Sequence, residues 1–142
     1  MTPMQTGHSD STTAGVRIRV AAQFLPEHSN PARGYYLFQY HVVIENCGES
    51  RARLLSRHWI IRDATGETRE VRGPGVVGEY PDLGPGEQYM YTSGCPLPTE
   101  WGTMEGTYRM GREDGSEFDA AIGRFFLAPT TAPIEAELIA TE

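Results

Sequence analysis

The sequence predicts an all-β fold, an antiparallel sandwich of about seven strands. Apolar and polar residues alternate with a period of two along most of the chain, which is the pattern of half-buried strands. The 142 residues include 16 Gly and 10 Pro, which interrupt helices and are common in turns. Two faces of alternating apolar residues need a second sheet about 10 Å away to cover them, so a sandwich is favoured over a barrel.

The length suits a single domain with flanking segments. Residues 1–15 are small and polar and show no periodicity, so we expect a disordered N-terminal lead-in there. The predicted domain covers residues 16–129. Residues 130–142 form a C-terminal tail, in which the stretch from Ile134 to Ala140 could form a short helix or pack as an extension.

The first half of the domain contains three expected strands. Apolar and charged residues alternate from Val16 to Val20, as in a half-buried strand. The segment from Tyr35 to Ile44 carries apolar residues on both faces, so it is expected to be central. A third strand is expected from Ala52 to Asp63. It places Leu55, Trp59 and Ile61 on one face and Leu54, His58 and Ile60 on the other.

Turn residues divide the second half into four more strands, at 68–72, 88–93, 103–112 and 118–127. Gly66 is free to adopt positive φ and closes the first of these hairpins, and Asp114-Gly115 is a strong signal for the last one. In the final strand the apolar residues move from even to odd numbers at Gly123. A β-bulge at this glycine would produce that shift.

The charge and the composition exclude several classes of function. The net charge is −7, so neither nucleic-acid binding, which needs a basic face, nor insertion into or binding of an anionic membrane is expected. All basic residues are arginine, which excludes a Schiff-base lysine. The start has no signal-peptide pattern and no apolar run approaches the roughly 20 residues of a membrane span. The sequence therefore predicts a cytoplasmic protein with Cys47 and Cys95 as free thiols.

No set of residues indicates catalysis, a metal or a cofactor. Ser56 and Ser93 lack the context of an activated nucleophile, and Cys95 precedes Pro96, which suits a turn. The histidines have no ligand spacing, although His41 and His58 could face each other across adjacent strands. We therefore expect no enzyme activity, no metal site and no cofactor.

A glycine-rich segment is the main candidate binding site. Residues 73–78 match G-x-G-x-x-G, but Tyr80-Pro81 and the glycines and proline at 84–86 prevent the helix that a dinucleotide site needs. Two interpretations remain open: a turn whose glycines supply positive φ, or a nest of backbone N–H groups for an anion. The residues of the anion hypothesis are Arg57, Arg72, Gly73, Gly75, Val76, Val77 and Gly78.

Aromatic residues raise a second possibility, a protein-binding groove. Trp59 fits the buried tryptophan of a sandwich core, while Arg57, between apolar neighbours, needs a partner. The remaining aromatic residues either line a groove or pack with their hydroxyls in water. They are Tyr35, Tyr80, Tyr89, Tyr91, Trp101 and Tyr108.

Four linked motifs, spread between Val16 and Pro129, resemble the ApaG family. They are LLSRHWII at 54–61 followed by Asp63 and Gly66, EVRGPGVVGE at 70–79, YTSGCPL at 91–97 and GTMEG at 102–106. Several motifs in the right order are more specific than one short pattern.

The resemblance implies a fibronectin type III/immunoglobulin-like sandwich and a genetic association with cobalt and magnesium resistance or efflux, under the family name CorD. It also implies relatives that serve as binding modules in F-box proteins and in a polymerase-delta-interacting protein, pyrophosphate binding at the glycine motif, and no established catalytic residues. The prediction is a non-enzymatic binding domain for a phosphate- or pyrophosphate-like anion or an unknown partner protein. The alternative is a purely structural interaction module without a small-molecule ligand.

Overall fold

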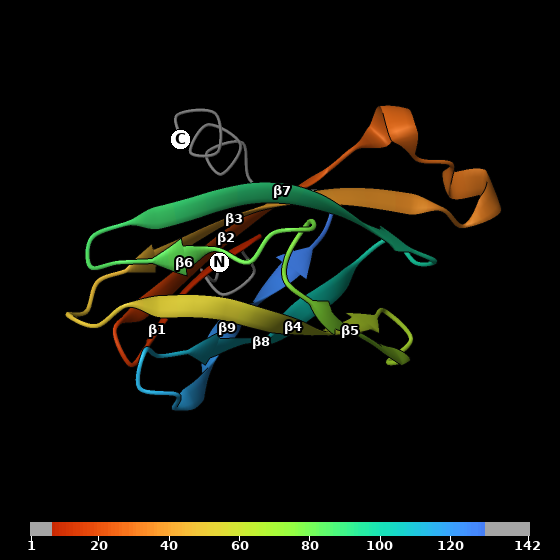
Figure 1. Ribbon diagram of the computed structural model, residues 1–142. Coiled ribbons are helices and arrows are strands. Elements are labelled where there is room, and N and C mark those ends of the chain that lie inside the picture. Colours follow the sequence, from red (N-terminus) through yellow and green to blue (C-terminus); the bar gives the residue numbers. More distant parts are fainter. Residues whose placement is uncertain (1–6, 130–142) are drawn as a thin grey trace.

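A computed structural model describes residues 7–129 as two antiparallel sheets packed face to face (Figure 1). One sheet has the strand order β1-β2-β3-β7 and the other β5-β4-β8-β9, with the short β6 paired to β4. Two 3-10 turns, η1 (Pro26–His28) and η2 (Pro31–Arg33), precede β3. The strands are β1 (His8–Thr13), β2 (Val16–Phe24), β3 (Tyr36–Asn46), β4 (Ala52–Asp63), β5 (Thr68–Pro74), β6 (Asp82–Leu83), β7 (Gln88–Leu97), β8 (Gly102–Gly111) and β9 (Glu117–Leu127). The predicted sandwich is confirmed, with β1 and β6 in addition to the seven expected strands.

The expected disorder of residues 1–15 is wrong for His8–Thr13, which form β1 and pair with β2. Positive φ at Ala14 and Gly15 makes the turn between them, and the guanidinium of Arg17 binds the carboxylate of Asp10 at 2.6 Å. A polar segment can therefore be ordered as an edge strand, because pairing with β2 satisfies the hydrogen bonds of its backbone even though its side chains are polar. Residues 1–6 and the predicted tail at 130–142 lie outside the described residues.

Trp59 lies at the centre of the core with 2% of its surface exposed, as predicted. Its indole makes edge contacts with the rings of Tyr40, Tyr108 and Phe125, at centroid distances of 5.3 to 6.2 Å. Such edge-to-face pairs add about 0.5–1.5 kcal/mol each beyond the burial of area. Both sheets are thus tied to one aromatic cluster in the middle of the sandwich.

Two β-bulges set which residues face this core. The predicted bulge at Gly123 is confirmed, because Gly106 pairs with Ile122 while Met104 pairs with Phe125. A second bulge in β4, between Leu54 and Ser56, was not predicted. It turns Leu54, rather than Leu55, toward the core, on the same side of β4 as Trp59. The expectation that Leu55 shares the face of Trp59 and that Leu54 lies on the other face is therefore wrong.

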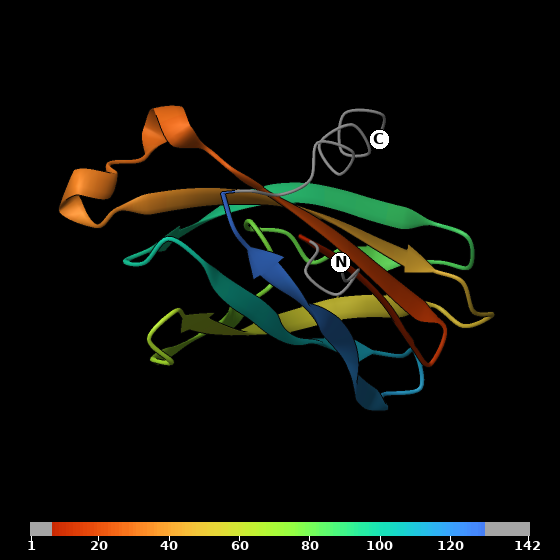
Figure 2. The same ribbon diagram turned by 180° about the vertical axis from the view of Figure 1, so that it is seen from behind.

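The two long sides of the sandwich differ. On one side β1 and β9 close the gap (Figure 2), since the Ala121 N–H donates to Thr13 Oγ1 at 3.1 Å. On the opposite side β5 and β7 are the edges of their sheets. The chain from Gly75 to Gly86 crosses part of this open side (Figure 1) and inserts the buried Val76 into the core. The predicted glycine-rich site therefore lies on the open side.

Candidate functional site

The glycine-rich segment ends in a tight turn that we call the 75–80 loop. Val76 and Glu79 exchange two backbone hydrogen bonds, of 2.9 and 2.8 Å. Between them Val77 has φ 42° and Gly78 has φ 81°, so both central residues are left-handed, as in a type I′ turn. Gly75 also has positive φ, of 59°. The glycines at 75 and 78 therefore supply the backbone geometry that the turn interpretation requires.

Two of the amides in the anion hypothesis are already bonded within the protein. The N–H of Gly75 donates to the carbonyl of Leu55 at 3.0 Å, and the N–H of Val76 donates to that of Glu79. Val76 is also buried in the core. A nest formed by these successive amides is therefore not available to an anion without breaking the turn.

Arg57 finds its partner in the loop itself. Its Nη1 donates to the carbonyls of Pro74 and Gly75, both at 2.9 Å. The guanidinium passes directly over Gly73, where a Cβ would lie 2.9 Å from Nη2. Gly73 therefore permits the close approach of Arg57 rather than supplying positive φ, and the bonds of Arg57 hold the loop in place.

The outer face of the β5-β4-β8-β9 sheet brings three of the predicted residues together. A cavity of about 280 Å³, which we call the outer cavity, is lined by Arg57, Arg72 and Gly73. Sequence reasoning missed its other members: two flank Arg57 on β4, and three come from β8 and β9, which are far from β4 in the sequence. They are Ser56, His58, Thr107, Arg109 and Asp119.

Carboxylates neutralise much of the positive charge around the outer cavity. Glu70 accepts from His58 at 2.8 Å and from Arg72 at 3.1 Å, and these two bonds lower the pKa of Glu70. Arg109 is paired with Glu117 at 2.9 Å and with Asp119 at 3.2 Å. Val77 and Gly78 do not line this cavity, so the structure divides the predicted anion residues between two places.

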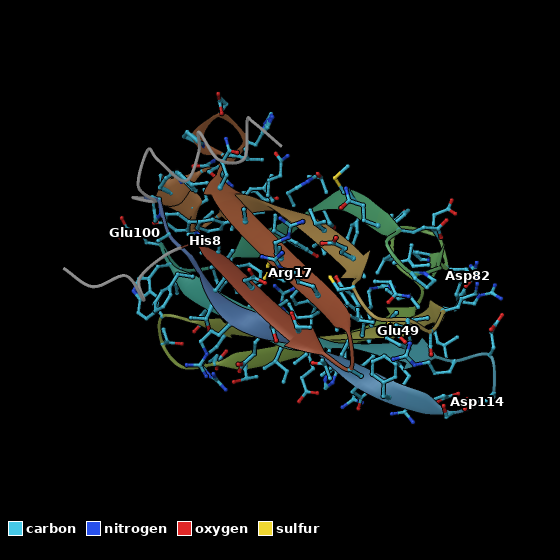
Figure 3. All side chains as sticks on the ribbon, turned by 90° about the vertical axis from the view of Figure 1, so that its left-hand side faces the viewer. His8, Arg17, Glu49, Asp82, Glu100 and Asp114 are labelled. Atoms are coloured by element: carbon cyan, nitrogen blue, oxygen red, sulfur yellow. The ribbon has the colours of Figure 1, made fainter. Side chains whose placement is uncertain are left out.

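A further cavity of about 370 Å³ lies at the end of the sandwich that carries Asp82 and Asp114 (Figure 3). Both arginine and carboxylate side chains line it, and Arg51 is within 3.4 Å of Asp82. Arg112, which also lines it, is bonded to the carbonyls of Ala14 and Ser50. Arg51 and Arg112 are therefore bound to groups of the protein itself.

The histidines and cysteines that the sequence analysis considered for chemistry do not come together in the structure. His41 lies on β3 and His58 on β4, in different sheets, so the expectation that they could face each other across adjacent strands is wrong. Cys95 lies within β7 rather than in a turn, and its burial raises the pKa of the thiol to about 11. Within residues 7–129 there is no group of three or more histidine, cysteine or acidic side chains placed to hold a metal ion.

The aromatic residues divide between the core and the surface. Tyr91 and Tyr108 are buried and their hydroxyls are hydrogen-bonded to each other. Tyr35, Tyr80 and Trp101 are exposed. Only the exposed aromatic residues are therefore available to a partner. One of them, Tyr80, belongs to the 75–80 loop.

The two sheets, the buried Trp59 and the glycine-rich loop on the open side define a fibronectin type III/immunoglobulin-like β-sandwich domain. The family model of the ApaG domain (DUF525) matches residues 26–112. The chain belongs to the ApaG family. In residues 7–129 no helix is long and apolar enough to span a bilayer.

Relatives and solved structures resemble the chain over most of its length. Protein ApaG of Pseudomonas aeruginosa (strain LESB58) is 55% identical over 113 residues, which cover 80% of this chain and 90% of that protein. Protein ApaG of Aromatoleum aromaticum is 48% identical, with 84% and 94% covered. The crystal structure of the putative ApaA protein from Bordetella pertussis is 45% identical, with a TM-score of 0.79 and 89% and 98% of the two chains covered. The C-terminal domain of wzt, at 11% identity and a TM-score of 0.52, shares the fold alone; 87% of this chain and 80% of that one are covered.

Proposed function

We propose that this chain is a non-enzymatic binding domain that docks a partner protein through the tip of the 75–80 loop. The proposal rests on the exposure and the backbone conformation of Val77. Its side chain is 55% exposed although its φ is 42°. A β-branched residue in this conformation is an outlier, and Asn or Gly is the ordinary choice at this position of a type I′ turn. Residues that reduce stability in this way cluster at functional sites.

The neighbourhood of Val77 also suits a protein partner. Tyr80 is 45% exposed, and its ring lies against Gly75, where a Cβ would be 3.5 Å from Cε2. Exposed aromatic residues on a rigid support are typical of protein interfaces. Arg57 and the paired amides of Gly75 and Val76 make the support rigid. The loop therefore presents two apolar side chains from a fixed backbone.

Val77→Asn separates binding from folding. Asparagine suits left-handed φ, so the free energy of unfolding should rise by about 1 kcal/mol, measured by urea denaturation. Proteins captured from a bacterial extract on the immobilised domain should be lost with this variant, as measured by quantitative mass spectrometry. Met90→Gln, which changes an exposed apolar residue on β7, is the matched control and should leave capture unchanged.

Capture of the same proteins by Val77→Asn and by the unaltered domain would contradict the proposal. It would favour the alternative of a structural module in which the glycine-rich loop only shapes the edge of the sandwich. The cobalt and magnesium association that the resemblance implies acts, in our proposal, through a cytoplasmic partner rather than through a bound ion.

A phosphate- or pyrophosphate-like anion is the second candidate ligand. The outer cavity supports it, because Arg57, Arg72 and Arg109 surround a volume of about 280 Å³ together with two hydroxyl residues. Arginine is well suited to bidentate contacts with phosphate.

Titration with pyrophosphate tests the second candidate. The backbone amide signals of Ser56, Arg72 and Gly73 should shift in NMR spectra, and Arg72→Gln should weaken binding by about fivefold because one exposed charge is lost. Arg53→Gln, an exposed arginine that does not line the outer cavity, is the control. Unchanged amide signals at millimolar pyrophosphate would exclude the anion.

A further inference from the structure

The 75–80 loop leaves part of the open side uncovered, and we call this part the β5/β7 cleft. Two cavities lie along it. One, of about 180 Å³, is lined by Arg57, Trp59 and Ile61 of β4, by Arg69 and Val71 of β5 and by residues 93–96 of β7. The other, of about 150 Å³, is lined by Ile61, Glu67, Arg69 and Leu97 among others. The cleft is therefore bounded by the edges of both sheets.

Among residues 7–129, the backbone of β7 has no strand partner on the side that faces this cleft. Within these residues β7 pairs only with β3. The N–H of Asn46 at the end of β3 donates to the carbonyl of Glu87, so odd-numbered residues direct their backbone groups toward β3. The carbonyl of Pro96 instead accepts from Arg69 of β5 at 3.0 Å. Because alternate residues point the same way, the backbone groups of Thr92 and Gly94 also point toward the cleft.

At Thr92 and Gly94, β7 lacks the usual protection of an edge strand. Natural sheets protect exposed edges with charged residues, proline, bulges or covering segments, and the one proline of β7, Pro96, lies beyond these two residues. The ten residues from Gln88 to Leu97 include no charged side chain, and their register with β3 is regular. The edge at Thr92 and Gly94 can therefore accept another strand.

The 180 Å³ part of the cleft is positively charged, whereas Asp63 and Glu67 line the 150 Å³ cavity. Arg57 and Arg69 both line the 180 Å³ cavity, and none of the acidic residues among 7–129 does so. The guanidinium groups of Arg57 and Arg69 donate to backbone carbonyls, and that of Arg69 also to the sulfur of Cys95. Within residues 7–129 neither guanidinium has a carboxylate within 4.0 Å, whereas Arg17, Arg62, Arg72, Arg109 and Arg124 do. The apolar part of the lining is Trp59, Ile61, Val71 and Met104.

We infer that the β5/β7 cleft binds an extended segment of a partner protein that pairs with β7 and carries a carboxylate near an apolar side chain. The added strand hydrogen-bonds to Thr92 and Gly94. Side chains two residues apart share one face of a strand, so the apolar side chain contacts the apolar lining while the carboxylate meets Arg69 and Arg57. Strand addition gains affinity from the backbone and specificity from such alternate side chains. The inference rests on the proposed function in that the ligand is a protein.

A pair of synthetic peptides tests this inference. Each has about eight residues of alternating Thr and Val, the length of an ordinary strand, with one central Val replaced by Glu in one peptide and by Gln in the other. The Glu peptide should slow hydrogen exchange of the Thr92 and Gly94 amides by about tenfold at saturation. The Gln peptide should bind about fivefold more weakly, because it lacks the charge.

Two variants assign the charge effect. Arg69→Gln should remove the preference for the Glu peptide, whereas Arg53→Gln, which does not line the cleft, should retain it. Unchanged exchange of Thr92 and Gly94 at millimolar peptide, or equal binding of both peptides, would overturn the inference.

The outcomes also separate the inference from the proposed function. If Val77→Asn still captures the same proteins while the peptide protects β7, the loop proposal fails and the cleft stands. If Val77→Asn loses its partners while no peptide protects β7, the cleft fails and the loop proposal stands.

Discussion

Gly106→Ala is expected to cost more than about 4 kcal/mol of folding free energy, the range of the most damaging single substitutions. Gly106 lies in β8 opposite Trp59 of β4. A Cβ at this position would lie 2.0 Å from the carbonyl oxygen of His58 and 3.1 Å from Trp59 Cα. Both obstacles are backbone atoms, so no rotamer change can relieve the clash. The two central strands of the sheet would have to separate beside the core tryptophan.

Urea denaturation followed by circular dichroism measures the effect. Gly94→Ala is the matched control, because Gly94 is also a strand glycine and its Cβ would meet nothing closer than 3.6 Å. That variant should stay within about 0.5 kcal/mol of the unaltered protein. If Gly106→Ala unfolds at the same urea concentration as Gly94→Ala, the close approach of β4 and β8 at this point is wrong.

Asn46→Asp is expected to have the second largest effect, also about 4 kcal/mol at neutral pH. Asn46 is 0% exposed. Its Nδ2 donates to the carbonyls of Ser50 and Leu83 at 2.8 and 2.9 Å, and its Oδ1 accepts from the N–H of Gly48 at 3.0 Å. Aspartate replaces the two donated hydrogens by an acceptor that faces two carbonyl oxygens. The variant therefore combines a buried charge with unsatisfied backbone groups.

The loss of stability should depend on pH in a defined direction. Burial beside two carbonyls raises the pKa of the new carboxyl in the folded state above about 3.9, its value in the unfolded chain. The penalty is thus smallest below that unfolded value and grows as the pH rises toward the folded pKa. Unfolding at about pH 4 and about pH 7 measures this difference.

Asn30→Asp provides the control, because it makes the same chemical change at an exposed asparagine. It should change the stability by less than about 0.5 kcal/mol. Equal losses in the two variants, or a penalty at position 46 that shrinks as the pH rises, would contradict the bonding of Asn46. The Asn46 side chain also stabilises the open side of the sandwich, since its bond to the carbonyl of Leu83 holds β6, which follows the 75–80 loop, in place.

Local sequence patterns were sufficient to predict much of the fold. They failed where contacts between distant segments determine which residue faces the core. The alternation that placed Trp59 in the core and the phase shift at Gly123 are both found in the structure. The bulge at Leu55 has no comparable signal, because Leu54 and Leu55 are equally apolar and either can face the core. The sequence around Asn46 indicates a turn residue, although its side-chain amide bonds three backbone groups, two in the turn after β3 and one in β6.

The sequence by itself determined the class of fold and the family, because these depend on the period of the apolar residues and on the order of the motifs. Only the tertiary structure decided what Arg57 and Gly73 do, since their contact joins β4 to β5. It also decided that β1 and β9 close one side while β5 and β7 remain edges. The order of strands in a sheet follows from packing between distant segments, and no local pattern encodes it.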